Sequence, residues 1–254
     1  MRHFLSLTDV ERGRVEALLA EAARLKAESK AVVPPRPPAA SLGLVFEKQS
    51  RCAPGPASRG RWPNWAAVRS SSATDGHGER ESVPDFACTL SSYTDVVALR
   101  TFKHETIEES FATRECRSST ACPTVHLPAL GDLLTIQETF GKLEGKTLVF
   151  VGDGNNVARS VAVGCGLFGL KFILAAPEGY GFDERFLQKY RKLVPGGQIQ
   201  VNGRLEHAVG EADVIYTDVW TSMGQEAERE ERRKQFALLQ VNERRWRRPR
   251  RTPG

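Results

Sequence analysis

Two polar turns in the second half of the chain have the residue types that bind small charged molecules. The first, GDGNN at residues 152–156, directly follows five β-branched, aromatic or aliphatic residues at 147–151. Such an uninterrupted run is typical of a parallel strand that is covered on both faces. Two adjacent asparagines, Asn155 and Asn156, can hold the charged ends of an amino acid at the start of the next helix. Simple helix capping by Asn155 is an equally good interpretation.

The second polar turn, DVWTSMG at residues 218–224, follows another predicted strand at residues 213–216. Because ligands of parallel sheets bind at the carboxyl ends of the strands, we expect this turn to lie beside the first. Asp218 would then be available for an ammonium group and Ser222 for a carboxylate. The alternative is a surface loop whose Trp220 and Met223 belong to the core.

The first turn also contains half of a dinucleotide-binding loop. Gly152 and Gly154 match the first two glycines of G-x-G-x-x-G, but Val157 stands at the third position. The next predicted strand, residues 172–175, is followed by Ala176 and Pro177 rather than by an acidic residue that could bind a ribose. The pattern therefore disfavours a nucleotide site.

The periodicity of apolar residues predicts the elements that position these turns. Thr8 and Glu11 form a capping box for an amphipathic helix whose apolar positions include Val15, Leu18, Leu19 and Leu25. Residues 51–80 and 110–128 have no sustained period, and neither helix nor strand is predicted there. The other predicted elements are strands at 42–46, 95–102, 147–151, 172–175, 198–201 and 213–216, and helices at 130–140, from 156 and at 182–193. This alternation predicts an α/β fold of doubly wound parallel sheets with helices on both faces.

Composition narrows the class of protein. The chain has 254 residues, is 40% hydrophobic and carries a formal charge of +5 with a pI near 9.0. Six arginines lie at 244–251, so the basicity belongs to the last dozen residues, and nucleic-acid binding by this tail is an alternative function. No run of about 20 apolar residues and no secretory signal is present, which predicts a cytoplasmic protein without a membrane partner. The five cysteines lack zinc-site spacing and are expected to be free thiols.

Several segments resemble the ornithine carbamoyltransferases. The matching stretches are FEKQS at 46–50, ESV at 81–83, VVALRTFKHETIEE at 96–109, LGDLLTIQETFGKLEGKTLVFVGDGNNVARS at 130–160, and DVWTSMGQEAERE at 218–230. The SMG motif at 222–224 distinguishes the ornithine enzymes from the aspartate enzymes. The resemblance implies two doubly wound domains joined by crossing helices, a carbamoyl-phosphate domain at 1–139 and an ornithine domain at 145–254. It also implies a homotrimer with the active site between the domains.

The resemblance further implies a reaction and a set of site residues. The δ-amine of L-ornithine attacks the carbonyl carbon of carbamoyl phosphate, giving citrulline and phosphate, and neither a metal nor an organic cofactor is required. Catalysis then depends on stabilising the charge of the phosphate and of the carbonyl oxygen. Arg100 and Ser50 correspond to carbamoyl-phosphate contacts, and the ornithine contacts are Asn156, Asp218, Ser222 and Met223.

The chain departs from the family pattern at three motifs. The phosphate loop S-[TL]-R-T-R is replaced after Ser50 by RCAPGP, whose prolines remove N–H donors. The motif H-P-C-Q falls on residues 125–128, which places the candidate catalytic residue His126 one position out of register. The motif H-C-L-P does not occur before Gly254. The N-terminal domain is therefore expected to be disrupted and the C-terminal domain incomplete.

A change of reading frame would account for these departures. Codons that encode residues 51–57 as RCAPGPA can read S-L-R-T-R-A-S when started one nucleotide earlier, and the arginine-rich end has the composition of GC-rich sequence read out of frame. The leading interpretation is an ornithine carbamoyltransferase with weak or absent activity. The alternatives are a non-catalytic remnant that binds ornithine and a nucleic-acid-binding protein.

Overall fold

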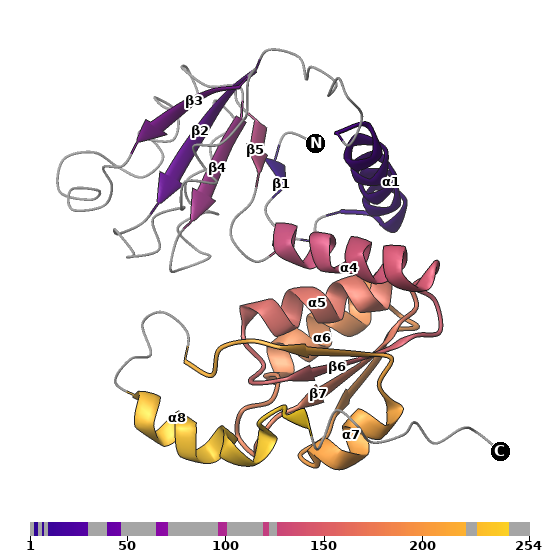
Figure 1. Cartoon of the computed structure of the whole chain (residues 1–254), viewed down its shortest axis with the longest axis vertical. Coiled ribbons are helices and arrows are strands. Elements are labelled where there is room, and N and C mark those ends of the chain that lie inside the picture. The colour runs from indigo at the N-terminus through magenta and orange to yellow at the C-terminus, as the bar shows by residue number, and fades with distance from the viewer. Residues whose placement is uncertain are drawn as a thin grey trace. The chain divides into compact units, whose positions relative to one another are not determined.

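The computed structural model describes residues 3–4, 7, 10–29, 40–46, 65–70, 96–100, 119–121, 126–221 and 228–243. The chain divides into two compact units, residues 1–127 and 128–254, whose elements are labelled in Figure 1. Each unit contains a parallel sheet; the described residues of the first unit include the helix α1, and those of the second include several helices. The predicted α/β fold is confirmed.

The first unit is built on a five-stranded sheet in which every pairing is parallel. Its elements are β1 (His3–Phe4), α1 (Arg12–Ser29), β2 (Ala40–Phe46), β3 (Trp65–Ser70), β4 (Val96–Arg100) and β5 (Ser119–Ala121). The order is β1-β5-β4-β2-β3, so the chain places β3 on one side of β2 and then β4 on the other. The strand order thus reverses between β2 and β4, where an open α/β sheet binds its ligands.

Three strands of the first unit, β1, β3 and β5, lie where the sequence pattern predicted none. β3 pairs with β2 from Ala40↔Trp65 to Val45↔Ser70, and β5 is a three-residue strand between β4 and β1. Both gain their stability from pairing with distant strands, which a local pattern does not record. The predicted helix α1 begins at Arg12, and Val15 and Leu19 are buried. Leu18 and Leu25, predicted on the same apolar face, are 48% and 43% exposed.

The second unit is built on a four-stranded parallel sheet of order β8-β7-β6-β9. Its strands are β6 (Thr147–Val151), β7 (Lys171–Ala175), β8 (Gln198–Val201) and β9 (Val214–Thr217). The helices are α4 (His126–Phe140), which begins two residues before the unit boundary, α5 (Asn156–Leu167), α6 (Glu184–Leu193), α7 (Leu205–Glu211) and α8 (Arg229–Phe236), followed by a 3-10 turn, Ala237–Leu239. α7 and α8 were not predicted, and α4 starts four residues earlier than expected, with Pro128 in its first turn, where proline is tolerated.

Both faces of this sheet are covered at its inner strands β6 and β7, which explains why residues 148–151 and 172–175 are apolar without alternation, whereas the edge strand β8 alternates and is largely exposed. Val149 and Val151 share a buried cluster with Leu205 of α7 and Phe236 of α8. On the opposite face Phe150 stacks on Tyr216, with ring centroids 5.1 Å apart. Figure 1 shows α5 and α6 on one side of the sheet and α7 and α8 on the other. In the described part of the chain, no helix is long and apolar enough to cross a bilayer.

Cys165 of α5 is a free, fully buried thiol, and burial raises its pKa far above its ordinary value. The prediction of a free thiol is confirmed there. The other four cysteines lie outside the described residues.

Close packing around Tyr190 leads to a first prediction. A methyl group added at Gly166 would overlap the Tyr190 hydroxyl, so Gly166→Ala is expected to lower the free energy of unfolding by about 1–3 kcal/mol. Replacing a helical glycine by alanine ordinarily stabilises by about 0.5–1 kcal/mol. Gly210→Ala in α7, where a methyl group meets nothing within 4 Å, is the matched control.

The hydroxyl itself can be removed to test this cause. It is buried without a hydrogen-bond partner among the described residues, so Tyr190→Phe should restore most of the stability of Gly166→Ala. Urea unfolding followed by circular dichroism measures Gly166→Ala, Gly210→Ala, Tyr190→Phe and the double variant with Gly166→Ala and Tyr190→Phe. Equal stabilities of Gly166→Ala and Gly210→Ala would contradict the prediction.

Candidate functional site

The two polar turns of the second unit lie at the point where its strand order reverses. The chain runs from β6 to β7 and β8 on one side and then returns to β9 on the other side of β6. β6 and β9 pair in parallel up to Val151↔Thr217. The turn after Val151 and the segment after Thr217 therefore leave the sheet side by side, at the edge where such sheets bind ligands.

The first turn ends in a capped helix. The Asn155 side chain accepts a hydrogen bond from the Ala158 N–H at 2.9 Å, which satisfies one of the free donors at the start of α5. The predicted capping role of Asn155 is confirmed. Asn156, the first residue of α5, is exposed, and its backbone carbonyl accepts from the Ser160 hydroxyl at 2.9 Å.

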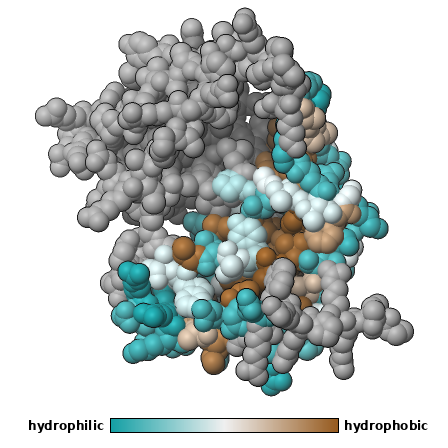
Figure 2. Space-filling view, in the orientation of Figure 1, coloured by the Kyte–Doolittle hydropathy of each residue, from teal (hydrophilic) through white to brown (hydrophobic). Residues whose placement is uncertain are grey.

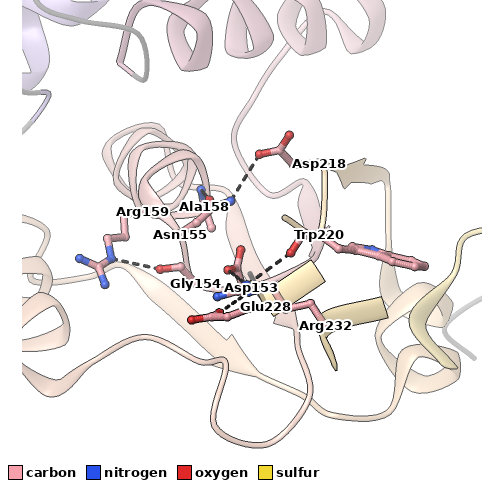
Figure 3. A network of polar contacts seen from close by, with 9 residues as sticks. All are labelled: Asp153, Gly154, Asn155, Ala158, Arg159, Asp218, Trp220, Glu228 and Arg232. Carbon is pink, nitrogen blue, oxygen red and sulfur yellow. Dashed lines mark hydrogen bonds and ion pairs between the residues drawn. The ribbon is translucent and has the colours of Figure 1, made fainter. Parts of the chain in front are cut away.

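Asp218 lies beside this turn, as the sheet-end argument predicted. Its Oδ2 accepts from Asn155 Nδ2 at 3.4 Å (Figure 3), and its Oδ1 accepts from the Val219 N–H at 2.7 Å. Both donors are neutral, and among the described residues no cation is paired with this partly buried carboxylate. Asp218 thus retains a negative charge that a ligand's ammonium group can neutralise.

A buried ion pair joins α8 to the first turn, and the sequence interpretation missed it. Arg232 of α8 donates from Nη1 to Asp153 Oδ2 at 2.7 Å, and the two side chains are only 8% and 12% exposed. Arg232 also donates from Nε to Glu228 at 2.9 Å and from Nη1 to the Trp220 carbonyl at 3.3 Å. Figure 3 shows these contacts joining α8, the first turn and the segment that follows Asp218.

Spacing along α8 could have revealed this arginine. Arg232 precedes Phe236 by four residues and Leu239 by seven, and both of these are buried in the core. The charged neighbours of Arg232 on α8 are exposed, and Figure 2 shows hydrophilic side chains over this helix. An arginine in line with an apolar stripe is buried only when it is paired.

The first turn leaves no room for a dinucleotide. The Gly152 N–H donates to the Ala175 carbonyl at 3.1 Å and the Gly154 N–H donates to the Tyr180 carbonyl at 2.8 Å, so neither is free for a phosphate. A methyl group at Gly154 would lie 2.6 Å from the Gly181 carbonyl oxygen, which shows how closely protein atoms pack there. The lack of room for a dinucleotide agrees with the sequence, in which Val157 stands at the position of the third glycine.

Of the other predicted site residues, the structure gives the backbone position of two and does not describe the remaining three. Arg100 is the last residue of β4, opposite Phe46 at the end of β2, so its backbone lies where the strand order of the first unit reverses. His126 is the first residue of α4. Ser50, Ser222 and Met223 lie outside the described residues, as does the arginine-rich tail at 244–254.

Comparison with known proteins decides the family. A model of the aspartate/ornithine carbamoyltransferase carbamoyl-P binding domain matches residues 2–138, and a model of the Asp/Orn binding domain of the same family matches residues 144–251. The chain belongs to the aspartate/ornithine carbamoyltransferase family. It is therefore a carbamoyltransferase by family.

Individual carbamoyltransferases agree with this assignment. The chain is 37% identical to the ornithine carbamoyltransferase of Methanosarcina mazei, with 95% of this chain and 80% of the relative covered. It is also 37% identical to the Bacillus subtilis enzyme, with 95% and 76% covered. The structure of ornithine carbamoyltransferase from Pyrococcus furiosus is similar, with a TM-score of 0.81, 31% identity, and 96% of this chain and 80% of that chain covered.

Proposed function

We propose that this protein transfers the carbamoyl group of carbamoyl phosphate to the δ-amine of L-ornithine, giving citrulline and phosphate in arginine metabolism. The observation that carries the proposal is Asp218. Its carboxylate receives only neutral donors among the described residues and lies at the ligand-binding edge of the sheet. Membership of the carbamoyltransferase family supplies the reaction class.

The second unit would hold ornithine. Asp218 would bind the α-ammonium group, because opposite charges attract strongly where water is partly excluded. The exposed Asn156 can donate its amide to the α-carboxylate. Ser222 and Met223 are proposed as further contacts, to the carboxylate and to the aliphatic side chain respectively.

The first unit would hold carbamoyl phosphate. Arg100 is proposed to donate to phosphate and carbonyl oxygens through its planar guanidinium, and Ser50 to bind the phosphate. His126 is proposed as a contact of the carbamoyl group. The lone pair of the neutral δ-nitrogen would attack the carbonyl carbon, the bond from that carbon to the phosphate oxygen would break, and the nitrogen would lose a proton. The work of the protein is to orient the substrates and stabilise charge.

The rate is expected to be low. After Ser50 the chain reads RCAPGP, and prolines there provide no N–H donors for a phosphate. A change of reading frame is the proposed origin of this segment, and sequencing the gene tests it. Codons at 51–57 that cannot encode S-L-R-T-R in another frame would exclude a frame change.

Assembly and location are part of the proposal. A cytoplasmic homotrimer is expected, in which a neighbouring subunit completes the phosphate site. Light scattering on the purified chain measures its mass, and a species of three 28.1 kDa chains is the expected result. A monomer at micromolar concentration would contradict it.

Two measurements on the full chain test the reaction. Calorimetry with L-ornithine and with carbamoyl phosphate determines whether each substrate binds alone or after the other. A colorimetric citrulline assay then determines whether they react, and slow citrulline formation is expected. Ornithine binding without citrulline would indicate a non-catalytic ornithine-binding protein, and no binding of either substrate would overturn the proposal.

A further inference from the structure

Asn155 is the residue through which the first polar turn contacts the second. Its Oδ1 accepts a hydrogen bond from the Ala158 N–H at 2.9 Å, and its Nδ2 donates to Asp218 Oδ2 at 3.4 Å (Figure 3). The two contacts use opposite ends of one amide group. The proposed reaction gives a role to Asn156 and to Asp218, but it gives none to Asn155.

The helix cap decides which end of the Asn155 amide faces Asp218. Because the Ala158 N–H is a donor, it must meet the amide oxygen of Asn155 and not the NH2 group. The opposite orientation would set two donors against each other at Ala158 and bring the amide oxygen against the carboxylate. The start of α5 therefore directs the NH2 group of Asn155 at the Asp218 carboxylate. Asn155 is partly buried, which limits competition from water for this contact.

Asn155 is the contact that ties the Asp218 side chain to another element. Thr217 is the last residue of β9 that pairs with β6, so Asp218 leaves the sheet without a ladder partner. The donor to its Oδ1, the Val219 N–H, belongs to the next residue and moves with the Asp218 backbone. Asn155, in contrast, lies 63 positions earlier in the chain. Among the described residues, the direction of the Asp218 carboxylate relative to the first turn is set by Asn155.

We propose that Asn155 is a positioning residue that orients the Asp218 carboxylate toward the α-ammonium group of ornithine. The proposal rests on the proposed function for its ligand, although the orientation of Asp218 is a property of the free protein. Asn155 does not touch the substrate. A carboxylate that is oriented before binding loses less freedom when the ammonium group arrives, which raises the affinity. The contact is long for an N–H···O hydrogen bond and its donor is neutral, so the carboxylate keeps its charge for the ligand.

Asn155→Ser separates positioning from helix capping. Serine is about as good an N-cap as asparagine, but it is too short to reach Asp218 as well. The variant should keep the urea midpoint of unfolding. It should weaken the Kd of L-ornithine about 3- to 10-fold, as expected when a side chain must first be ordered on binding.

Asn202→Ser is the matched control. Asn202 directly follows β8, its Oδ1 accepts from the Arg204 N–H at 2.9 Å, and its Nδ2 contacts His207. The same substitution is therefore made at another asparagine whose amide has two partners, on a strand that is not a neighbour of β9. It should leave the ornithine Kd unchanged.

A ligand without the α-ammonium group tests whether Asn155 acts through Asp218. The compound 5-aminopentanoate is ornithine without its α-amine, so it offers Asp218 no α-ammonium partner. Asn155→Ser should leave the Kd of 5-aminopentanoate unchanged. In a chain that already carries Asp218→Ala, Asn155→Ser should cause no further loss of ornithine affinity, since both changes act on one contact. Calorimetry on the full chain measures each Kd.

The free protein offers a measurement that requires no ligand. The Val219 N–H donates to Asp218 Oδ1, so a less restrained Asp218 side chain should speed exchange of this amide with water. NMR should show exchange of the Val219 amide several-fold faster in Asn155→Ser, approaching the rate in Asp218→Ala. Asn202→Ser should not change it.

The outcomes distinguish this proposal from the proposed function. Unchanged exchange of the Val219 amide in Asn155→Ser would overturn the positioning role, whatever the protein binds. An equal loss of affinity for ornithine and for 5-aminopentanoate would also overturn it, because Asn155 would then contact another part of the ligand. Faster exchange in a protein that binds no ornithine would support the orientation of Asp218 by Asn155 and exclude the proposed function.

Discussion

Arg232→Met is expected to lower the free energy of unfolding by about 3–5 kcal/mol, because it leaves the carboxylate of Asp153 buried without its cation. Arg232 and Asp153 form an ion pair of 2.7 Å between side chains that are nearly removed from water. The second partner, Glu228, is 60% exposed and contributes little by comparison. Methionine retains much of the apolar length of arginine, so the loss should reflect charge rather than packing.

Two further variants isolate the cause. Arg233→Met changes the neighbouring, exposed arginine of α8 and should alter the stability by no more than about 0.5 kcal/mol. Adding Asp153→Asn to Arg232→Met removes the stranded charge and should recover part of the loss. Urea unfolding curves recorded at one ionic strength give all three values. Similar curves for Arg232→Met and Arg233→Met would show that the buried pair is unimportant.

Asp218→Ala is expected to weaken the affinity for L-ornithine about 100-fold or more. Losing a close charge pair at a binding site costs about 2–5 kcal/mol, and each 1.4 kcal/mol is a factor of ten in Kd. The fold should change little, since among the described residues Asp218 accepts only from the Asn155 amide and the Val219 N–H. Affinity for carbamoyl phosphate should be retained, because its proposed ligands lie in the other unit.

A matched control is available on the same sheet edge. Glu178 follows β7 and is exposed, so Glu178→Ala removes the same charge from the end of a neighbouring strand. Calorimetry should give an unchanged ornithine Kd for this variant. Equal weakening of the ornithine affinity by Glu178→Ala and Asp218→Ala would mean that only the general negative potential matters. An unchanged ornithine Kd for Asp218→Ala would show that Asp218 is not an ornithine contact.

The central strand and both polar turns were predictable because their signals are local. Residues 148–151 are apolar throughout, and Asn155 has the side chain that a helix start requires. The neighbourhood of Asn155 and Asp218 followed from one topological rule, that strand ends of a parallel sheet share an edge. The roles of Asn156 and Asp218 toward ornithine stay predictions, and Ser222 and Met223 lie outside the described residues.

Elements held mainly by distant partners were missed. β3 has six residues of mixed polarity, and its strand conformation depends on pairing with β2. α8 is so rich in charge that its apolar side, Phe236 with the adjoining Leu239, was overlooked. The pairing of Arg232 with Asp153 spans 79 positions in the chain, so the local spacing that places Arg232 in line with Phe236 and Leu239 does not identify its partner.

The sequence by itself determined the α/β class and the family, because strand periodicity, turn glycines and motif order are properties of consecutive residues. Only the tertiary structure decided which charges are neutralised. Asp153 and Asp218 both follow apolar strands, yet Asp153 is paired with a buried arginine and Asp218 receives only neutral donors among the described residues. That difference depends on where α8 packs, since the attraction between charges is set by their separation and burial and not by their distance along the chain.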